Sequence, residues 1–149
     1  MGLIINQQLD IPAQAIFDQL ELEYNDGCGN SLIFDGGPVQ RDRGFILHRT
    51  CDKQWESTVA IADDISLTAS KDILSDIAVG NGPADAMITL GYSSWESGQL
   101  EQELVQNSWL TIPADSAIIF HTDCAKRAGA AASSIGVNLE MLALDAGHA

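Results

Sequence analysis

Short apolar runs alternate along the chain with stretches whose apolar residues recur every three or four positions. Uninterrupted runs bounded by turn residues are typical of buried strands. The strands that this pattern predicts span residues 3–6, 32–34, 45–47, 58–61, 65–68, 86–90, 109–112 and 118–120. Asp63 and Asp64 separate two of these runs, which predicts a hairpin turn.

Helical spacing is clearest after residue 12. Apolar residues follow there at i, i+3, i+4 and i+7, which makes one stripe on a helix: Ala13, Ile16, Phe17 and Leu20. We expect Asp10 to cap this helix and Pro12 to lie in its first turn. Further helices are predicted over residues 71–79, 99–107, 124–134 and 139–144, with Ser70 capping the first of these and Gly80 ending it.

Strands and helices are mixed without a regular strand–helix–strand rhythm, so the sequence predicts an α+β fold and not a doubly wound α/β fold. A length of 149 residues suits one domain, and we expect a single domain over residues 1–149. The longest apolar stretches are far shorter than a membrane span, and no export signal is visible. We therefore expect a cytoplasmic protein that does not bind membranes.

Charge narrows the range of partners. Seven Lys and Arg residues face 21 Asp and Glu residues, which gives a formal net charge of −14. Phosphate neutralisation dominates nucleic-acid binding, so direct binding to DNA is disfavoured. The basic residues form only two small groups, one of Arg41, Arg43 and Arg49 and one of Lys126 and Arg127, and ordinary ion pairing accounts for them best. The three cysteines are widely spaced, and we expect no disulfide framework.

Three segments together resemble the YqgE/AlgH family. The first spans residues 34–48 and opens on FDGGPV. The second spans residues 90–104 and reads LGYSSWESGQLEQEL. The third is the C-terminal Gly-His-Ala of residues 147–149. The resemblance covers the whole chain in order and spacing.

This resemblance implies an α+β fold whose mixed sheet is curled into a pseudo-barrel with short flanking helices. As a class, the family has no established enzymatic activity. Some members carry the label of transcriptional regulator through a genetic link to alginate production, which does not establish DNA binding. Members usually have a further upstream segment, so we expect the chain to be truncated at its N-terminus. An unpaired edge near Leu3, Ile4 and Ile5 would then favour self-association.

The turn that contains Gly36 and Gly37 has two interpretations. Its backbone amides could cradle an anion, or its glycines could serve a tight turn, which the absence of a phosphate-binding fingerprint favours. Arg43 has two interpretations as well. It could bind a carboxylate or phosphate, or it could pair with Asp35 or Asp42.

The segment around Tyr92, Trp95, Gln99 and Glu103 is the best candidate for a functional surface. Aromatic residues on loops are frequent binding anchors, and Gln99 and Glu103 share one helix face. The structural alternative is that Tyr92 and Trp95 cover the edge of the core.

Histidine carries no metal signal here. We include His48, which closes the first family-like segment, among the candidate binding residues, but His48, His121 and His148 lack a metal-binding spacing. No metal and no cofactor is predicted.

The sequence therefore favours a non-enzymatic binding or regulatory protein that contacts an unknown protein or a small anionic ligand. The alternative is an enzyme of unrecognised type that uses a cleft around Arg43, Tyr92 and Glu103. A direct DNA-binding regulator is the least favoured class.

Overall fold

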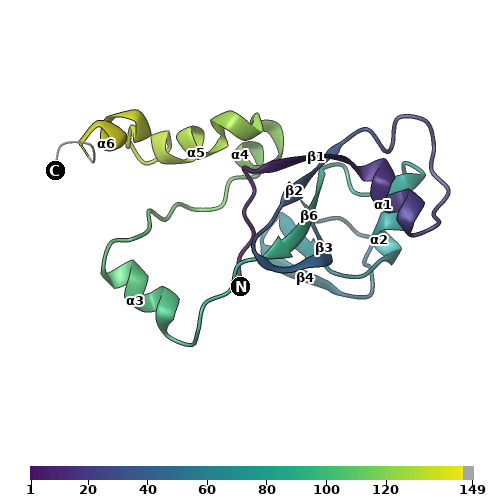
Figure 1. Cartoon of the computed structure of the whole chain (residues 1–149), viewed down its shortest axis with the longest axis horizontal. Coiled ribbons are helices and arrows are strands. Elements are labelled where there is room, and N and C mark those ends of the chain that lie inside the picture. The colour runs from purple at the N-terminus through teal and green to yellow at the C-terminus, as the bar shows by residue number, and fades with distance from the viewer. Residues whose placement is uncertain (146–149) are drawn as a thin grey trace. The chain divides into compact units, whose positions relative to one another are not determined.

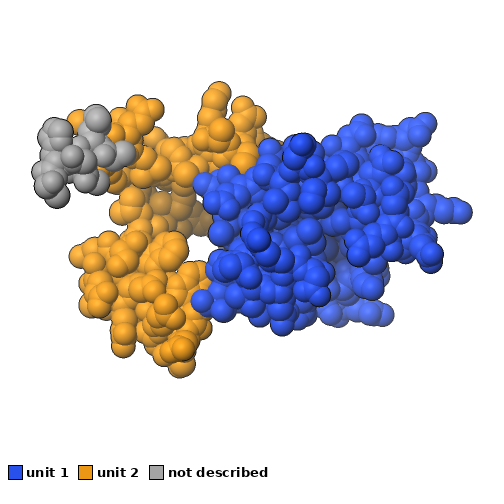
Figure 2. Space-filling view, viewed as in Figure 1, with its two compact units in different colours: residues 1–94 blue, residues 95–149 orange. Residues whose placement is uncertain are grey.

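The structure is a computed structural model that describes residues 1–145. It divides into two compact units, Met1–Ser94 and Trp95–Ala149, called unit 1 and unit 2 below (Figure 2). Unit 1 holds the sheet and two helices, and the described part of unit 2 holds four short helices (Figure 1). None of the helices in the described part of the chain has the length and hydrophobicity needed to cross a bilayer.

Unit 1 is built on a six-stranded mixed sheet. Its strands are β1 (Gln8–Pro12), β2 (Leu32–Asp35), β3 (Val39–Arg49), β4 (Thr58–Ala62), β5 (Ile65–Thr68) and β6 (Ala86–Tyr92). The strand order is β1-β2-β6-β3-β5-β4, in which only β2 and β6 run parallel. The predicted α+β class, the hairpin of β4 and β5 and the four strands over residues 32–34, 45–47, 65–68 and 86–90 are confirmed.

The sheet is open, which corrects the expected curl into a pseudo-barrel. Its edge strands, β1 and β4, lie at opposite ends of the strand order. Closure requires the first and last strands to pair along their length at a steady tilt. Each edge strand here has five residues, and both contain a register shift.

Two helices pack on one face of the sheet and complete the core of unit 1. These are α1 (Ala13–Gln19) and α2 (Asp72–Ala78), which lie beside each other (Figure 1). Phe17, Ile33 and Ile73 have no exposed surface. The predicted stripe on α1 forms the contact, with Ala13 and Phe17 fully enclosed and Ile16 and Leu20 packed at the margin.

The N-terminal segment differs from the prediction. Residues 3–6 form no strand, although the Ile4 amide donates to the Gly36 carbonyl and Gly2 makes an isolated bridge with Ser93. The first strand is β1, which contains Asp10, and α1 begins only after Pro12. Proline forces the preceding residue toward an extended conformation, so the helix cannot start at Asp10. Self-association at Leu3–Ile5 stays a prediction.

Unit 2 contains α3 (Gln99–Val105), α4 (Ser116–His121), α5 (Cys124–Ser133) and α6 (Leu139–Asp145). The predicted helices after Gly98 and over residues 124–134 and 139–144 are confirmed. The strands predicted over 109–112 and 118–120 are wrong. The Asp115 carboxylate accepts hydrogen bonds from the amides of Ala117 and Ile118, and this cap starts α4 where a short apolar run suggested a strand.

Candidate binding site

The Gly36–Gly37 turn packs directly against the end of β6. A Cβ atom on Gly37 would lie 2.3 Å from the Tyr92 carbonyl carbon, and one on Gly36 would lie 2.4 Å from the Gly91 oxygen. Val39 is also opposite Tyr92 in the β3–β6 ladder. The first two family-like segments therefore meet at Gly36, Gly37 and Tyr92.

The amides of this turn are already engaged within the protein. The Gly36 amide donates to the Leu90 carbonyl at 2.8 Å, and the Gly37 amide donates to the Asp35 carboxylate at 3.3 Å. An anion cradle needs amides that point at the ligand. The geometry thus favours the structural interpretation, in which glycine permits a close backbone approach.

Arg43 lies in an aromatic cluster. Its guanidinium carbon is 5.3 Å from the centre of the Phe45 ring, and the Phe45 ring meets the Tyr92 ring edge-on at 5.6 Å between centroids. Asp35, one of the two carboxylates considered as a partner of Arg43, makes its ion pair with Arg41. Arg43 and Tyr92 are thus brought together through Phe45, a residue that the sequence analysis did not single out.

His48 is a buried residue of the sheet, with only 1% of its surface exposed. Its Nδ1 atom lies 2.8 Å from the Arg49 carbonyl oxygen, and its Nε2 atom lies 2.9 Å from the Thr68 hydroxyl. The ring also meets Trp55 edge-on. Both nitrogens have protein partners, so this arrangement fits a structural role better than ligand contact.

The other three candidate residues belong to unit 2 and form one hydrogen-bonded group. Glu103 accepts hydrogen bonds from the Trp95 indole at 3.1 Å, the Gln99 amide at 2.9 Å and the Trp109 indole at 2.7 Å. The two indole rings meet edge-on at 5.8 Å between centroids. We call these four residues the Trp–Glu clasp. Trp109 was missed as a member because the sequence analysis assigned it to a strand.

The Trp–Glu clasp favours the ionised form of its carboxylate. The hydrogen bonds from Trp109 and then from Gln99 lower the pKa of Glu103 most. Burial raises this pKa by less, and the bond from Trp95 lowers it by the smallest amount. A general acid at neutral pH needs a raised pKa. Glu103 is therefore unsuited to act as a general acid, and its ionised carboxylate is suited to hold the loop and the helix together.

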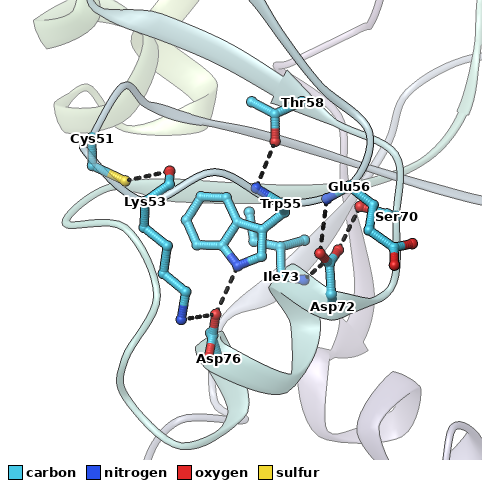
Figure 3. Close-up of polar contacts among 9 residues, drawn as sticks. All are labelled: Cys51, Lys53, Trp55, Glu56, Thr58, Ser70, Asp72, Ile73 and Asp76. Atoms are coloured by element: carbon cyan, nitrogen blue, oxygen red, sulfur yellow. Dashed lines mark hydrogen bonds and ion pairs between the residues drawn. The ribbon is translucent and has the colours of Figure 1, made fainter.

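A second polar cluster ties the loop before β4 to α2 (Figure 3). The Trp55 indole donates to Asp76 at 2.7 Å, and Lys53 makes an ion pair with the same carboxylate. Asp72 accepts from the Glu56 amide and the Ser70 hydroxyl at the start of α2. The prediction that Ser70 caps α2 is wrong, because the N-cap residue is Lys71 and the Ser70 hydroxyl donates to the Asp72 carboxylate.

Both carboxylates of this cluster are stabilised in their charged form. The pKa of Asp76 is lowered first by Lys53 and then by the Trp55 indole. Burial opposes ionisation of Asp72, but the hydrogen bonds from Ser70, Glu56 and Ile73 outweigh it and lower the pKa of that group. The cluster stabilises the fold of unit 1.

A groove of about 860 Å³ opens on the face of unit 1 that carries α1 and α2. Its apolar lining consists of aliphatic side chains: Ile16, Leu20, Ile46, Leu74, Ile88 and Leu90. Its polar lining includes Gln19, Gln40, Arg41, Asp42, Arg43, Ser70 and Lys71. Arg43 is the one candidate residue from the sequence analysis in this lining. The groove draws on four separate segments, so no local signal in the sequence could have revealed it.

The remaining basic residues are engaged elsewhere. Arg49 pairs with Asp64 and Asp85, and Lys126 pairs loosely with Asp123. Arg127 is buried in α5 and donates to the Thr122 carbonyl. Among the described residues, no group of three or more His, Cys, Asp or Glu side chains has a metal-binding arrangement. His148 and residues 147–149 lie outside the described residues.

Fold and groove together define an α+β protein with an open mixed sheet and one helix-covered face. The sequence profile of the family described as AlgH-like matches residues 1–140. A UPF0301 protein of Chromohalobacter salexigens is 44% identical over 99% of this chain and 80% of its own length. A UPF0301 protein of Azoarcus sp. is 47% identical, covering 100% of this chain and 79% of its own. The chain belongs to the AlgH-like family.

Solved structures agree with this assignment. The solution structure of the AlgH protein from Pseudomonas aeruginosa superposes with a TM-score of 0.77 at 42% identity and covers 100% of this chain and 79% of that one. The crystal structure of a Corynebacterium diphtheriae protein gives a TM-score of 0.61 at 14% identity, covering 85% of this chain and 68% of that one. The second likeness shows the fold alone.

Proposed function

We propose that this is a non-enzymatic binding or regulatory protein, and that the groove of unit 1 receives its ligand or partner. The observation that carries the proposal is the groove itself. Its volume of about 860 Å³ falls within the range of small-molecule sites, and it combines an aliphatic interior with a polar rim. A cytoplasmic location, expected from the sequence, is part of this proposal.

The enzyme alternative has less support. It relied on Arg43, Tyr92 and Glu103 acting in one cleft, but the Glu103 carboxylate is committed to the Trp–Glu clasp. Tyr92 is packed against Phe45 and is absent from the groove lining. A binding role needs only the shape and charge of the groove, which the described residues supply.

Blocking the groove tests the proposal. Gln19→Trp places a large side chain at the exposed rim on α1, and Gln102→Trp makes the same change on the exposed face of α3. Native mass spectrometry and pull-down of the purified full chain compare the bound molecules. We expect Gln19→Trp to lose ligand or partner that Gln102→Trp retains. Equal retention by both variants would exclude the groove as the binding face.

A further inference from the structure

We infer that the occupant of the groove is an amphipathic anion with a single aliphatic chain, such as a fatty carboxylate or an alkyl phosphate. This inference rests on the proposed function and specifies its ligand. The deepest lining residues, Ile46, Leu74 and Ile88, are aliphatic and at most 7% exposed. Ile16, Leu20 and Leu90 continue this surface toward the rim. A flexible hydrocarbon chain is complementary to such a surface.

The absence of aromatic side chains from this lining separates the site from a nucleotide pocket. Flat bases are usually held by stacking on aromatic rings or arginine planes, and their phosphates by glycine-rich loops. The one glycine in the lining is Gly44, within β3. An extended peptide is also a poorer match, because its backbone needs hydrogen-bond partners along its length and the buried lining offers only hydrocarbon.

The rim supplies the charge that selects an anion. Arg41, Arg43 and Lys71 are three of the seven basic residues of the chain, and they line the groove beside one carboxylate, Asp42. With Asp35, the partner of Arg41, included, the three cations and two carboxylates give a formal charge of +1 in a chain of −14. This positive charge is opposite in sign to the net charge of the protein, and it favours anions at the groove.

Lys71 is the cation best placed to hold the head group. Arg41 is committed to Asp35, and the Arg43 guanidinium rests over Phe45. Because Phe45 precedes Ile46 on β3, the two side chains point to opposite faces of the sheet. Lys71 is exposed and has no carboxylate partner among the described residues. We therefore assign the head-group contact to Lys71.

Titration calorimetry of the full chain with octanoate, decanoate and dodecanoate below micelle formation tests the inference. Each added methylene buried in the groove is expected to tighten binding about threefold to fourfold. Lys71→Gln is expected to weaken decanoate binding about tenfold, whereas Lys126→Gln, the same change at an exposed lysine of unit 2, leaves it unchanged. Decyl phosphate distinguishes a phosphate head from a carboxylate head, and binding of either anion supports the inference.

Four results would overturn it. Decanol binding as tightly as decanoate would show that the charged head group makes no contact that contributes to affinity. Decanoate binding that survives Gln19→Trp would place the site outside the groove. An acidic peptide that binds in a Gln19-dependent manner while all alkyl anions fail would reject the aliphatic ligand and leave the proposed binding function intact. Failure of every anion and peptide at the groove would reject both proposals.

Discussion

Each of the two units of this chain is stabilised internally by a different kind of interaction. Unit 1 encloses a continuous apolar core between its sheet and α1 and α2. In unit 2, α3 and α4 contain no buried residue, and α5 buries only Arg127 and Ala132. Polar side chains define local structure there, through the Trp–Glu clasp and the Asp115 cap. Apolar burial contributes about 1.5–3 kcal/mol per large side chain, whereas one hydrogen bond contributes about 1 kcal/mol net. The comparison therefore predicts that unit 1 dominates the stability of the fold.

Truncating a large side chain in each unit gives the sharpest contrast. Phe17→Ala removes a side chain with no exposed surface from the core and is expected to cost about 3–5 kcal/mol. Val105→Ala removes a side chain that is 83% exposed in α3 and is expected to change stability by less than about 0.5 kcal/mol. Urea denaturation measures both. Comparable losses in the two variants would contradict the division drawn between the units.

Adding one methyl group at a glycine in each unit tests how closely the surrounding atoms are packed. Gly36→Ala drives a Cβ atom into the Gly91 backbone oxygen and is expected to destabilise the protein by about 1–3 kcal/mol. Gly129→Ala, in α5, meets no atom within 4 Å and is expected to stabilise by about 0.5–1 kcal/mol. Thermal melts of the two variants should move in opposite directions, and a neutral Gly36→Ala would show that the turn can relax.

A smaller effect is expected from the polar cluster that anchors α2. The folded protein holds the pKa of Asp76 below its unfolded value, so this group stabilises the fold above about pH 4 and loses that contribution as pH falls through the folded pKa. Asp76→Asn is expected to cost on the order of 1 kcal/mol at pH 7 and to flatten the acid limb of the stability profile. Asp26→Asn, in an exposed loop, serves as the control and should leave the profile unchanged.

The smallest effect on global stability is expected at the Trp–Glu clasp. In Glu103→Gln one carboxylate oxygen becomes an NH2 group, so the side chain can no longer accept both from Gln99 at Oε1 and from the two indoles at Oε2. Of the three indole N–H resonances, those of Trp95 and Trp109 are expected to move while that of Trp55 stays in place. Glu101→Gln on the same helix is the matched control. Unchanged Trp95 and Trp109 resonances in Glu103→Gln would contradict the hydrogen bonds of the Trp–Glu clasp.

Several elements could be predicted from the sequence because their signals are local. The stripe of Ala13 and Phe17 has helical period, and the runs at 32–34, 45–47 and 86–90 are apolar and bounded by turn residues. Apolar runs of three or four residues without such boundaries are ambiguous between strand and helix. Residues 118–120 became helical because Asp115 caps α4, and residues 3–6 stayed outside the sheet while β1 formed further along the chain.

The sequence by itself determined the α+β class and the family. Only the tertiary structure decided that the sheet stays open, that Glu103 is held by two tryptophans and that Lys71 borders an aliphatic groove. The physical reason is distance along the chain. Periodicity and turn chemistry act over a few residues, whereas the groove joins α1, β3, β6 and the start of α2, which meet only when the core of unit 1 closes.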